Sequence, residues 1–306
     1  MLCWRNYAIV CVAEREIKLP EFGANLIRGK FGATFRKLVC LRKASDCSTC
    51  MLRFSCPYFY VFETRPPPGT RIMRKYNSAP RPFVISLPFK EIRLKKGDSL
   101  RIDLTLIGKA NDYLPHFAYT FLKVLKKMNF RLQSIFHEGN DLFKGEEIEI
   151  PVSSPKMLSF EIMEGRSFFS VSLSFETPLR LIFNERFQEE PSFSALLRNF
   201  FRRIVLLDYF HCGGDGIYPF KGILEELENV MLKEGRFVKK SYRRFSHRRS
   251  KPMRLEGILG EAVYAPVPSF LLSYLDAMKD LHVGRNTTFG FGKVVMKDAR
   301  GIKGDS

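Results

Sequence analysis

The chain has 306 residues, of which 45% are hydrophobic and 29 are Phe, so its length suits one large domain or two domains of about 150 residues with packed cores. An excess of 50 Lys and Arg over 32 Asp and Glu gives a formal charge of +18, which favours a polyanion partner, nucleic acid before an anionic membrane surface. There is no apolar run of about 18 residues and no signal-peptide pattern, so we expect a soluble, cytoplasmic protein with no membrane partner.

The first half of the chain alternates predicted strands and helices. A strand is expected over 7–13, and Ile27 begins a helical apolar spacing that predicts a helix over about 24–39. Apolar and polar residues alternate over 100–106, which is typical of a half-buried strand. Asp112 is a natural cap for a second helix, and a strand over 131–137 closes a β-α-β-β-α-β set of ferredoxin-like order.

A cluster of cysteines follows the first predicted helix. Seven cysteines in a large basic chain without an export signal argue against a disulfide framework. Four of them fall within seventeen residues: Cys40, Cys47, Cys50 and Cys56. Four thiolates with a two-residue central step favour a structural zinc ion, and an iron–sulfur cluster or unliganded thiols are the alternatives. No metal-dependent catalysis follows, because four thiolates leave no open position.

The second half begins at the prolines of 151–155 and repeats the same order of elements. Its expected elements are a long alternating strand over 169–183, helices over about 192–207, 224–232 and 269–281, two strands flanking 250–252, and a last strand over 291–296. We therefore predict an α+β chain of tandem ferredoxin-like (RRM-like) domains.

The predicted domains carry different functional segments. The first, over 1–150, holds the four-cysteine loop of 40–56. The second, over 151–306, holds a basic hairpin at 235–265 and a glycine-rich loop at 284–292.

The basic hairpin concentrates positive charge. Nine cations and no acidic residue lie between positions 235 and 254: Arg236, Lys239, Lys240, Arg243, Arg244, Arg248, Arg249, Lys251 and Arg254. Side chains of a strand alternate between its faces, so charge lines both faces, with Phe237, Tyr242, Phe245 and His247 interleaved. This pattern suits phosphates and unstacked bases of RNA. A solvated hairpin without a partner is the alternative, and a membrane or calmodulin-binding helix is disfavoured because helical apolar spacing is missing.

The glycine-rich loop runs directly into the last predicted strand. Gly284, Gly290 and Gly292 flank Arg285 and Asn286. Glycine has no Cβ, so such a backbone can approach another molecule closely. The bare pattern also fits a turn that starts a strand.

Together these segments resemble the CRISPR repeat-processing endoribonucleases of the RAMP superfamily. The residues that carry the resemblance are 26–32, 56–63, 104–108, 175–180, 257–261 and the terminal glycine loop. The resemblance implies tandem ferredoxin-like folds, CRISPR repeat RNA and precursor CRISPR RNA as partners, and metal-independent cleavage with no catalytic cofactor. The ribose 2′-hydroxyl would attack the adjacent phosphate and leave a 2′,3′-cyclic phosphate and a 5′-hydroxyl. Gly284, Gly290 and Gly292 would face RNA, with Arg285 as a phosphate or base contact.

The catalytic residues are where the chain departs from its relatives. Many relatives place a histidine shortly after the first helix, often with Tyr and Lys, whereas residues 1–115 contain no histidine here. Lys43 and Tyr58 lie in that region, and His247 in the basic hairpin is the first candidate among the histidines. His282, which stands where relatives have the first glycine of the loop, is the second.

The other three histidines, His116, His137 and His211, are expected to be structural. The alternative function is a non-catalytic RNA-binding RAMP subunit of a CRISPR interference complex, as a monomer or homodimer. A DNA-binding regulator is disfavoured because no helix-turn-helix or dimerising element is present.

Overall fold

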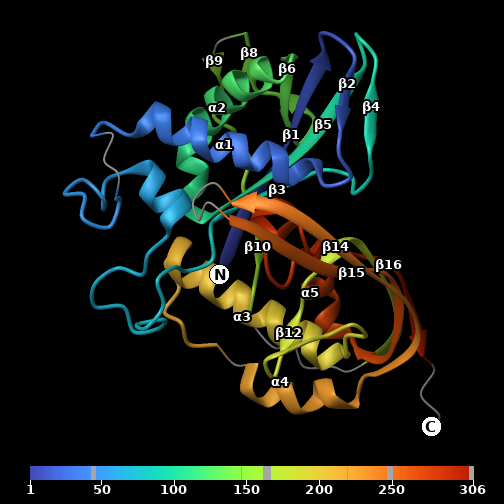
Figure 1. Ribbon diagram of the computed structural model, residues 1–306. Helices are drawn as coiled ribbons and strands as arrows, with labels where there is room; N and C mark the ends of the chain where they lie inside the picture. The colour runs from blue at the N-terminus through green and yellow to red at the C-terminus, as the bar shows by residue number, and fades with distance from the viewer. Residues whose placement is uncertain (43–45, 146, 161–166, 219, 247–250, 303–306) are drawn as a thin grey trace. The chain divides into compact units, whose positions relative to one another are not determined.

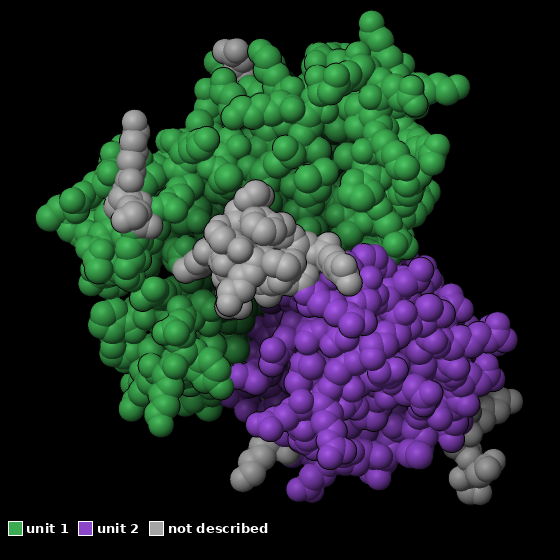
Figure 2. Space-filling view, viewed as in Figure 1, with its two compact units in different colours: residues 1–157, 205–217 green, residues 158–204, 218–306 purple. Residues whose placement is uncertain are grey.

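The computed structural model describes residues 1–42, 46–145, 147–160, 167–218, 220–246 and 251–302 (Figure 1). The chain forms two compact units, shown in different colours in Figure 2. Unit 1 comprises Met1–Met157 and Val205–Ile217, and unit 2 comprises Leu158–Ile204 and Tyr218–Ser306. No helix in the described part of the chain is long and apolar enough to cross a membrane.

Unit 1 is built on an antiparallel sheet with the strand order β3-β5-β1-β6-β7. Its strands are β1 (Leu2–Ala13), β3 (Phe83–Ser86), β5 (Ser99–Ile107), β6 (Phe130–His137) and β7 (Asn140–Asp141), with smaller strands β2 (Ile17–Leu19), β4 (Ile92–Leu94), β8 (Phe143–Lys144), β9 (Glu147–Ile148) and β10 (Lys156–Leu158). The central strand β1 pairs with β5 on one side and β6 on the other, with Ile9 opposite both Ile102 and Ile135. This is the ferredoxin-like arrangement that the alternating segments predicted.

Two helices supply the other half of the unit 1 core. They are α1 (Gly23–Val39) and α2 (Leu114–Lys127), both at the predicted positions. Phe31 of α1 is fully buried and its ring centroid lies 4.7 Å from that of Phe121 of α2. The prediction that Asp112 caps α2 is wrong, because a 3-10 turn (η2, Gly108–Tyr113) precedes the helix and no side chain caps it.

A long insertion separates α1 from β3. It contains the four cysteines, a π-helical turn (η1, Phe59–Glu63) and the proline-rich loop that begins at Arg65. Val61 and Phe62 of η1 are buried in the unit 1 core. The insertion is therefore anchored in the middle of its length rather than hanging free.

Unit 2 repeats the topology, with the sheet order β14-β15-β11-β16. Its elements are β11 (Phe168–Leu179), β12 (Ile182–Phe183), β13 (Arg186–Phe187), α3 (Phe193–His211), α4 (Phe220–Glu226), η3 (Leu227–Asn229), β14 (Met231–Ser246), β15 (Lys251–Pro268), η4 (Ser269–Leu271), α5 (Leu272–Leu281), η5 (Thr287–Phe289) and β16 (Val294–Ile302). The α+β, tandem ferredoxin-like prediction is thus confirmed.

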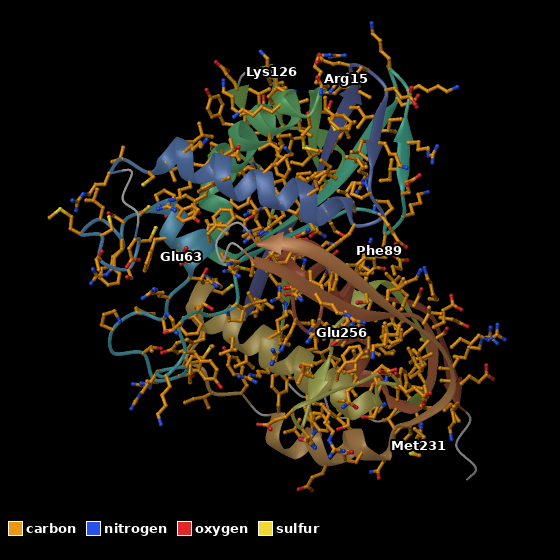
Figure 3. The ribbon with its side chains drawn as sticks, viewed as in Figure 1. Arg15, Glu63, Phe89, Lys126, Met231 and Glu256 are labelled. Atoms are coloured by element: carbon orange, nitrogen blue, oxygen red, sulfur yellow. The ribbon has the colours of Figure 1, made fainter. Side chains whose placement is uncertain are left out.

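Three element boundaries in unit 2 differ from expectation. The last strand, predicted over 291–296, is β16 at Val294–Ile302, because the residues before it belong to the glycine-rich loop. The strand predicted over 169–183 ends at Leu179, because the chain turns there and its last residues form the small β12–β13 pair. The helix predicted over 224–232 lies at Phe220–Glu226, and Met231 already belongs to β14 (labelled in Figure 3).

Candidate nucleic-acid interface

The basic segment forms the predicted hairpin. β14 and β15 pair without interruption from Gly235 opposite Ala262 to Ser246 opposite Lys251. β14 is the outermost strand of its sheet, and Arg236 and Lys239 on it are exposed. Of the other predicted RNA contacts, Lys240, Arg243 and Arg244 lie on β14. Arg248, Arg249 and the catalytic candidate His247 lie outside the described residues.

An aromatic ring organises the cations near the base of the hairpin. The Phe187 ring has the Lys239 ammonium 5.3 Å and the Arg180 guanidinium 5.9 Å from its centroid. Lys239 also pairs with Glu189, and Arg180 donates to Glu256 of β15 at 2.9 Å (labelled in Figure 3). Cation–π contacts and carboxylate pairs hold long basic side chains in defined positions. Phe187 was not singled out from the sequence, because its role depends on the β12–β13 turn.

The glycine-rich loop is folded onto its own unit. The Val283 amide donates to the Gly292 carbonyl at 2.9 Å, and the Arg285 amide donates to the Arg180 carbonyl at 2.9 Å. Gly284 and Gly292 have φ of +79° and +75°, and a Cβ on them would lie 2.5 Å from the Arg180 oxygen and 1.8 Å from the Val283 oxygen respectively. Packing within unit 2 therefore accounts for both glycines.

The accessible part of this loop is basic. Gly290 and Gly292 are buried, whereas Arg285 is exposed and Asn286 is partly exposed. The hydrogen bond from the Arg285 amide to the Arg180 carbonyl joins the loop to a residue whose guanidinium lies beside Phe187. RNA contact by the loop stays a prediction.

His282 does not have the properties of a proton-transfer group. Its side chain is 1% exposed, and its Nδ1 donates to the Phe291 carbonyl at 2.8 Å. Burial lowers the pKa of His282 to about 3, so the ring is neutral at physiological pH. The histidine holds the end of α5 against the glycine-rich loop.

The three histidines expected to be structural fall into two groups. His137 and His211 are buried with both ring nitrogens in hydrogen-bond contact: His137 with the Asn6 carbonyl and Ser153, His211 with Tyr60 and the Pro80 carbonyl. His116 is exposed at the start of α2, with its ring 5.7 Å from that of Tyr113.

Tyr58 lies beside two arginines of α1. Its ring stacks on Phe62 at 5.1 Å, the Arg36 guanidinium lies 5.5 Å from the Tyr58 ring, and that of Arg28 lies 5.2 Å from the Phe62 ring. Burial raises the pKa of Tyr58, with Arg36 and Arg28 opposing the shift. The phenol therefore keeps its proton at neutral pH and can donate it. Lys43 lies outside the described residues.

Arg28 and Arg36 were not predicted as site residues. They are eight residues apart on a helix, a spacing that returns to the same side of α1. The sequence shows this spacing, but only the folded structure shows that Tyr58 lies beside these two arginines.

The four cysteines do not form a ready metal site. All four are partly buried free thiols. Burial raises the pKa of Cys47, and neighbouring Cys40 and Cys56 raise it further. Among the described residues, however, no three His, Cys, Asp or Glu side chains converge as a metal ion requires. The zinc and iron–sulfur assignments stay predictions, and no chemical step is derived from them.

Each half of the chain matches a known family model. Residues 173–294 match the family model of the CRISPR-associated endoribonuclease Cas6, and residues 2–153 match a model described as an N-terminal domain. No curated protein matches the chain.

Solved Cas6 structures share the fold over nearly the full length. Thermus thermophilus Cas6 has a TM-score of 0.53 and 17% identity, covering 97% of this chain and 99% of its own. Another Cas6, solved as a substrate mimic complex, has a TM-score of 0.54 and 16% identity, covering 97% and 100%. A chain of a Cas6-RT-Cas1--Cas2 complex has a TM-score of 0.53 and 14% identity, covering 97% of this chain and 46% of its own. Residues 173–294 therefore match a Cas6 endoribonuclease domain, and the fold of the chain is that of the solved Cas6 proteins.

Proposed function

We propose that this Cas6-type protein binds CRISPR repeat RNA and cleaves precursor CRISPR RNA without a metal ion, leaving a 2′,3′-cyclic phosphate and a 5′-hydroxyl. The observation that carries the proposal is the Cas6 family match, which spans the basic hairpin and the whole glycine-rich loop. The exposed Arg236 of β14 and the exposed Arg285 of the glycine-rich loop support it, because positive side chains open to solvent suit an RNA backbone.

The proposed reaction is an internal transesterification. The 2′-oxygen forms a bond to phosphorus, the bond from phosphorus to the 5′-oxygen breaks, and one proton leaves the 2′-hydroxyl while another reaches the 5′-oxygen. A base near the first oxygen, an acid near the second and cations at the phosphate each lower the barrier.

Tyr58 is assigned the acid. Its raised pKa keeps the phenolic proton at neutral pH, and Arg36 beside it can stabilise the negative charge that develops on the phosphate oxygens. His247 is proposed as the base, with Lys43 as the alternative, on sequence grounds. Zinc at the four cysteines has no part in the reaction.

The proposed partners follow from the molecules bound in similar solved structures. Solved relatives include substrate mimic and product complexes of Cas6 and a Cas6-RT-Cas1--Cas2 complex. By that likeness we assign repeat RNA as the direct partner of this chain, and a CRISPR interference complex as the assembly that would receive the processed RNA.

The decisive experiment is cleavage of a labelled repeat RNA from the host's own array in excess EDTA. A single EDTA-resistant cut that disappears when the mapped position carries a 2′-deoxy sugar supports 2′-hydroxyl attack, and the end groups can be read by phosphatase sensitivity. Tyr58→Phe removes only the phenolic oxygen, so we expect a slower cut with unchanged binding.

Other outcomes have defined meanings. Cleavage that stops in EDTA and returns with Mg²⁺ contradicts the metal-independent mechanism. Tight repeat binding by the wild-type protein without any cut would assign the chain to the non-catalytic RAMP subunits.

A further inference from the structure

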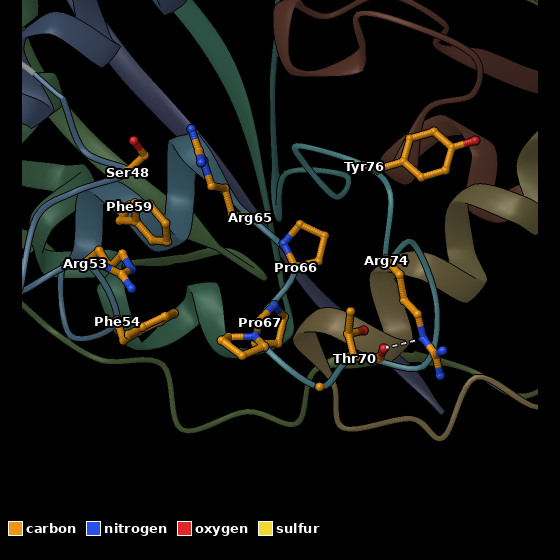
Figure 4. Close-up of a pocket in the computed structure, with 12 residues that line it drawn as sticks. Ser48, Arg53, Phe54, Phe59, Arg65, Pro66, Pro67, Thr70, Arg74 and Tyr76 are labelled. Atoms are coloured by element: carbon orange, nitrogen blue, oxygen red, sulfur yellow. Dashed lines mark hydrogen bonds between the residues drawn. The ribbon is translucent and has the colours of Figure 1, made fainter.

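The insertion between α1 and β3 encloses a pocket that the proposed cleavage does not use. The pocket has a volume of about 640 Å³ and is lined by residues between positions 48 and 76, all of unit 1 (Figure 4). This volume is within the usual range for small-molecule sites. The lining residues that matter here are Arg53, Phe54, Phe59, Arg65, Arg74 and Tyr76.

The pocket presents aromatic surface to solvent. Phe54 is 62% exposed and Tyr76 is 55% exposed. Phe54 is nevertheless fixed: its ring meets that of buried Phe59 edge-on at 6.3 Å, and the Arg53 guanidinium lies 4.6 Å from its centroid. The pocket therefore places two exposed rings where an unstacked base could lie against them.

The pocket is also positively charged. None of the described lining residues is acidic, and three are arginines. Within the described chain, Arg53 and Arg74 donate to the backbone carbonyls of Cys50 at 3.4 Å and Thr70 at 3.1 Å rather than to carboxylates. Among the described residues, neither of these two guanidinium groups pairs with a carboxylate, and both line the pocket that holds the exposed rings.

The wall of the pocket is stiff. Pro66, Pro67 and Pro68 form part of it, and proline fixes φ. The loop is tied down beyond them, because the amide of Arg71 donates to the Tyr209 hydroxyl at 3.1 Å. A stiff wall lowers the ordering cost of binding.

We propose that this pocket binds one unpaired nucleotide of an RNA strand, with the base against Phe54 and the phosphates at Arg65 and Arg74. Exposed rings beside unpaired guanidinium groups are the features by which proteins hold single-stranded nucleic acid. The proposal rests on the proposed function in taking RNA as the ligand. It adds a contact in unit 1 to those of the hairpin and glycine-rich loop in unit 2.

The test measures binding of an unstructured ten-nucleotide RNA by fluorescence anisotropy. Loss of one base-stacking contact corresponds to a dissociation constant raised about tenfold, and we expect this for Phe54→Ala. Arg65→Ala removes a phosphate contact, so it should weaken binding and reduce the slope of log K against log salt by about 0.7. Phe54→Trp should retain the affinity. The matched controls are Tyr119→Ala, an aromatic that is 46% exposed on α2, and Arg71→Ala, an exposed arginine of the same loop that does not line the pocket. Both should bind like the wild type.

Photo-cross-linking locates the contact directly. With 5-iodouridine in the oligonucleotide, we expect cross-linked peptides to include Phe54 or Tyr76. Wild-type affinity in Phe54→Ala and Arg65→Ala together with no cross-link in residues 48–76 would overturn the proposal. Because Phe54 is exposed, an unchanged thermal unfolding midpoint should show that Phe54→Ala is folded.

The two proposals fail separately. A wild-type protein that cuts the repeat while Phe54→Ala binds RNA as tightly overturns the pocket alone. A wild-type protein that binds the oligonucleotide through Phe54 but never cuts a repeat overturns the endonuclease alone.

Discussion

The sulfur atoms of Cys3 and Cys212 lie 3.7 Å apart, although 209 residues separate them in the chain. Cys3 is on β1 and Cys212 directly follows α3, so the contact fastens the end of α3 to the first strand within unit 1. The Cys3 amide adds a bond to the Cys212 sulfur at 3.5 Å. The hydrogen bond from Cys212 lowers the pKa of Cys3 to about 6 and raises that of Cys212.

Cys3 should therefore react as a thiolate at neutral pH. We expect iodoacetamide to label Cys3 with a midpoint at about pH 6, and to label Cys11 far more slowly because burial raises the pKa of Cys11 to about 12. Peptide mass spectrometry after timed quenching measures both rates. In Cys212→Ala the midpoint for Cys3 should move upward, and equal labelling of Cys3 and Cys11 would contradict this reading.

Burial of His282 should make the protein less stable in acid. Its pKa is lowered from 6.5 to about 3, so below pH 6.5 the unfolded chain binds a proton that the folded chain does not. The free energy of unfolding should thus fall by about 2 kcal/mol from this residue between pH 7 and pH 5. Urea unfolding at both pH values measures the change.

His282→Asn is the variant for comparison. Its amide can donate to the Phe291 carbonyl, and it keeps a side chain at a position whose φ of +57° and ψ of 163° strain Asn and His alike. The variant should lose about 2 kcal/mol less than the wild type over the same pH interval. An identical loss in both proteins would show that His282 is not the group responsible.

The glycine-rich loop should be sensitive to added volume for reasons of folding. Gly292→Ala places a Cβ 1.8 Å from the Val283 carbonyl oxygen at a φ of +75°, so the backbone must move. We expect a loss of about 2 kcal/mol or more in the free energy of unfolding. Gly301→Ala, where nothing lies within 4 Å, should change it little. A stable Gly292→Ala that only loses RNA would support a direct contact instead.

Arg285 should contribute to RNA affinity through charge. We expect Arg285→Ala to weaken binding of the repeat and to reduce the slope of log K against log salt by about 0.7, the value for one phosphate contact on a single strand. Lys279→Ala removes a cation already paired with Asp276 and should leave the slope unchanged. Anisotropy titrations at several salt concentrations give both slopes. An unaltered slope in Arg285→Ala would exclude this residue from the interface.

Periodicity predicted most of the fold because it reports burial directly. Alternation from Leu100 onward located β5, and apolar spacing from Ile27 located α1 almost to the residue. The positive charge of the hairpin could also be predicted, because its cations lie within one short segment of the sequence.

The rest could not be predicted, because it depends on residues brought together by the fold. The burial of His282, the neighbours of Tyr58 and the contact of Cys3 with Cys212 each join distant segments. The pocket around Phe54 lies in an insertion with no hydrophobic period, so the sequence offered only a stiff proline loop. Cysteine spacing likewise predicts which thiols could bind a metal ion, but not whether the fold brings them together around one point.

The position of β14 at the margin of its sheet gives its charges a second task. An outermost strand of 16 residues presents a row of backbone donors and acceptors to any other strand that approaches. Lysines and arginines on such a margin repel like chains and prevent edge-to-edge aggregation. Arg236 and Lys239, exposed on this strand, should oppose its pairing with a strand of another molecule. A variant that lacks both Arg236 and Lys239 should bind RNA more weakly and also self-associate. Sedimentation without RNA would distinguish self-association from the loss of RNA affinity.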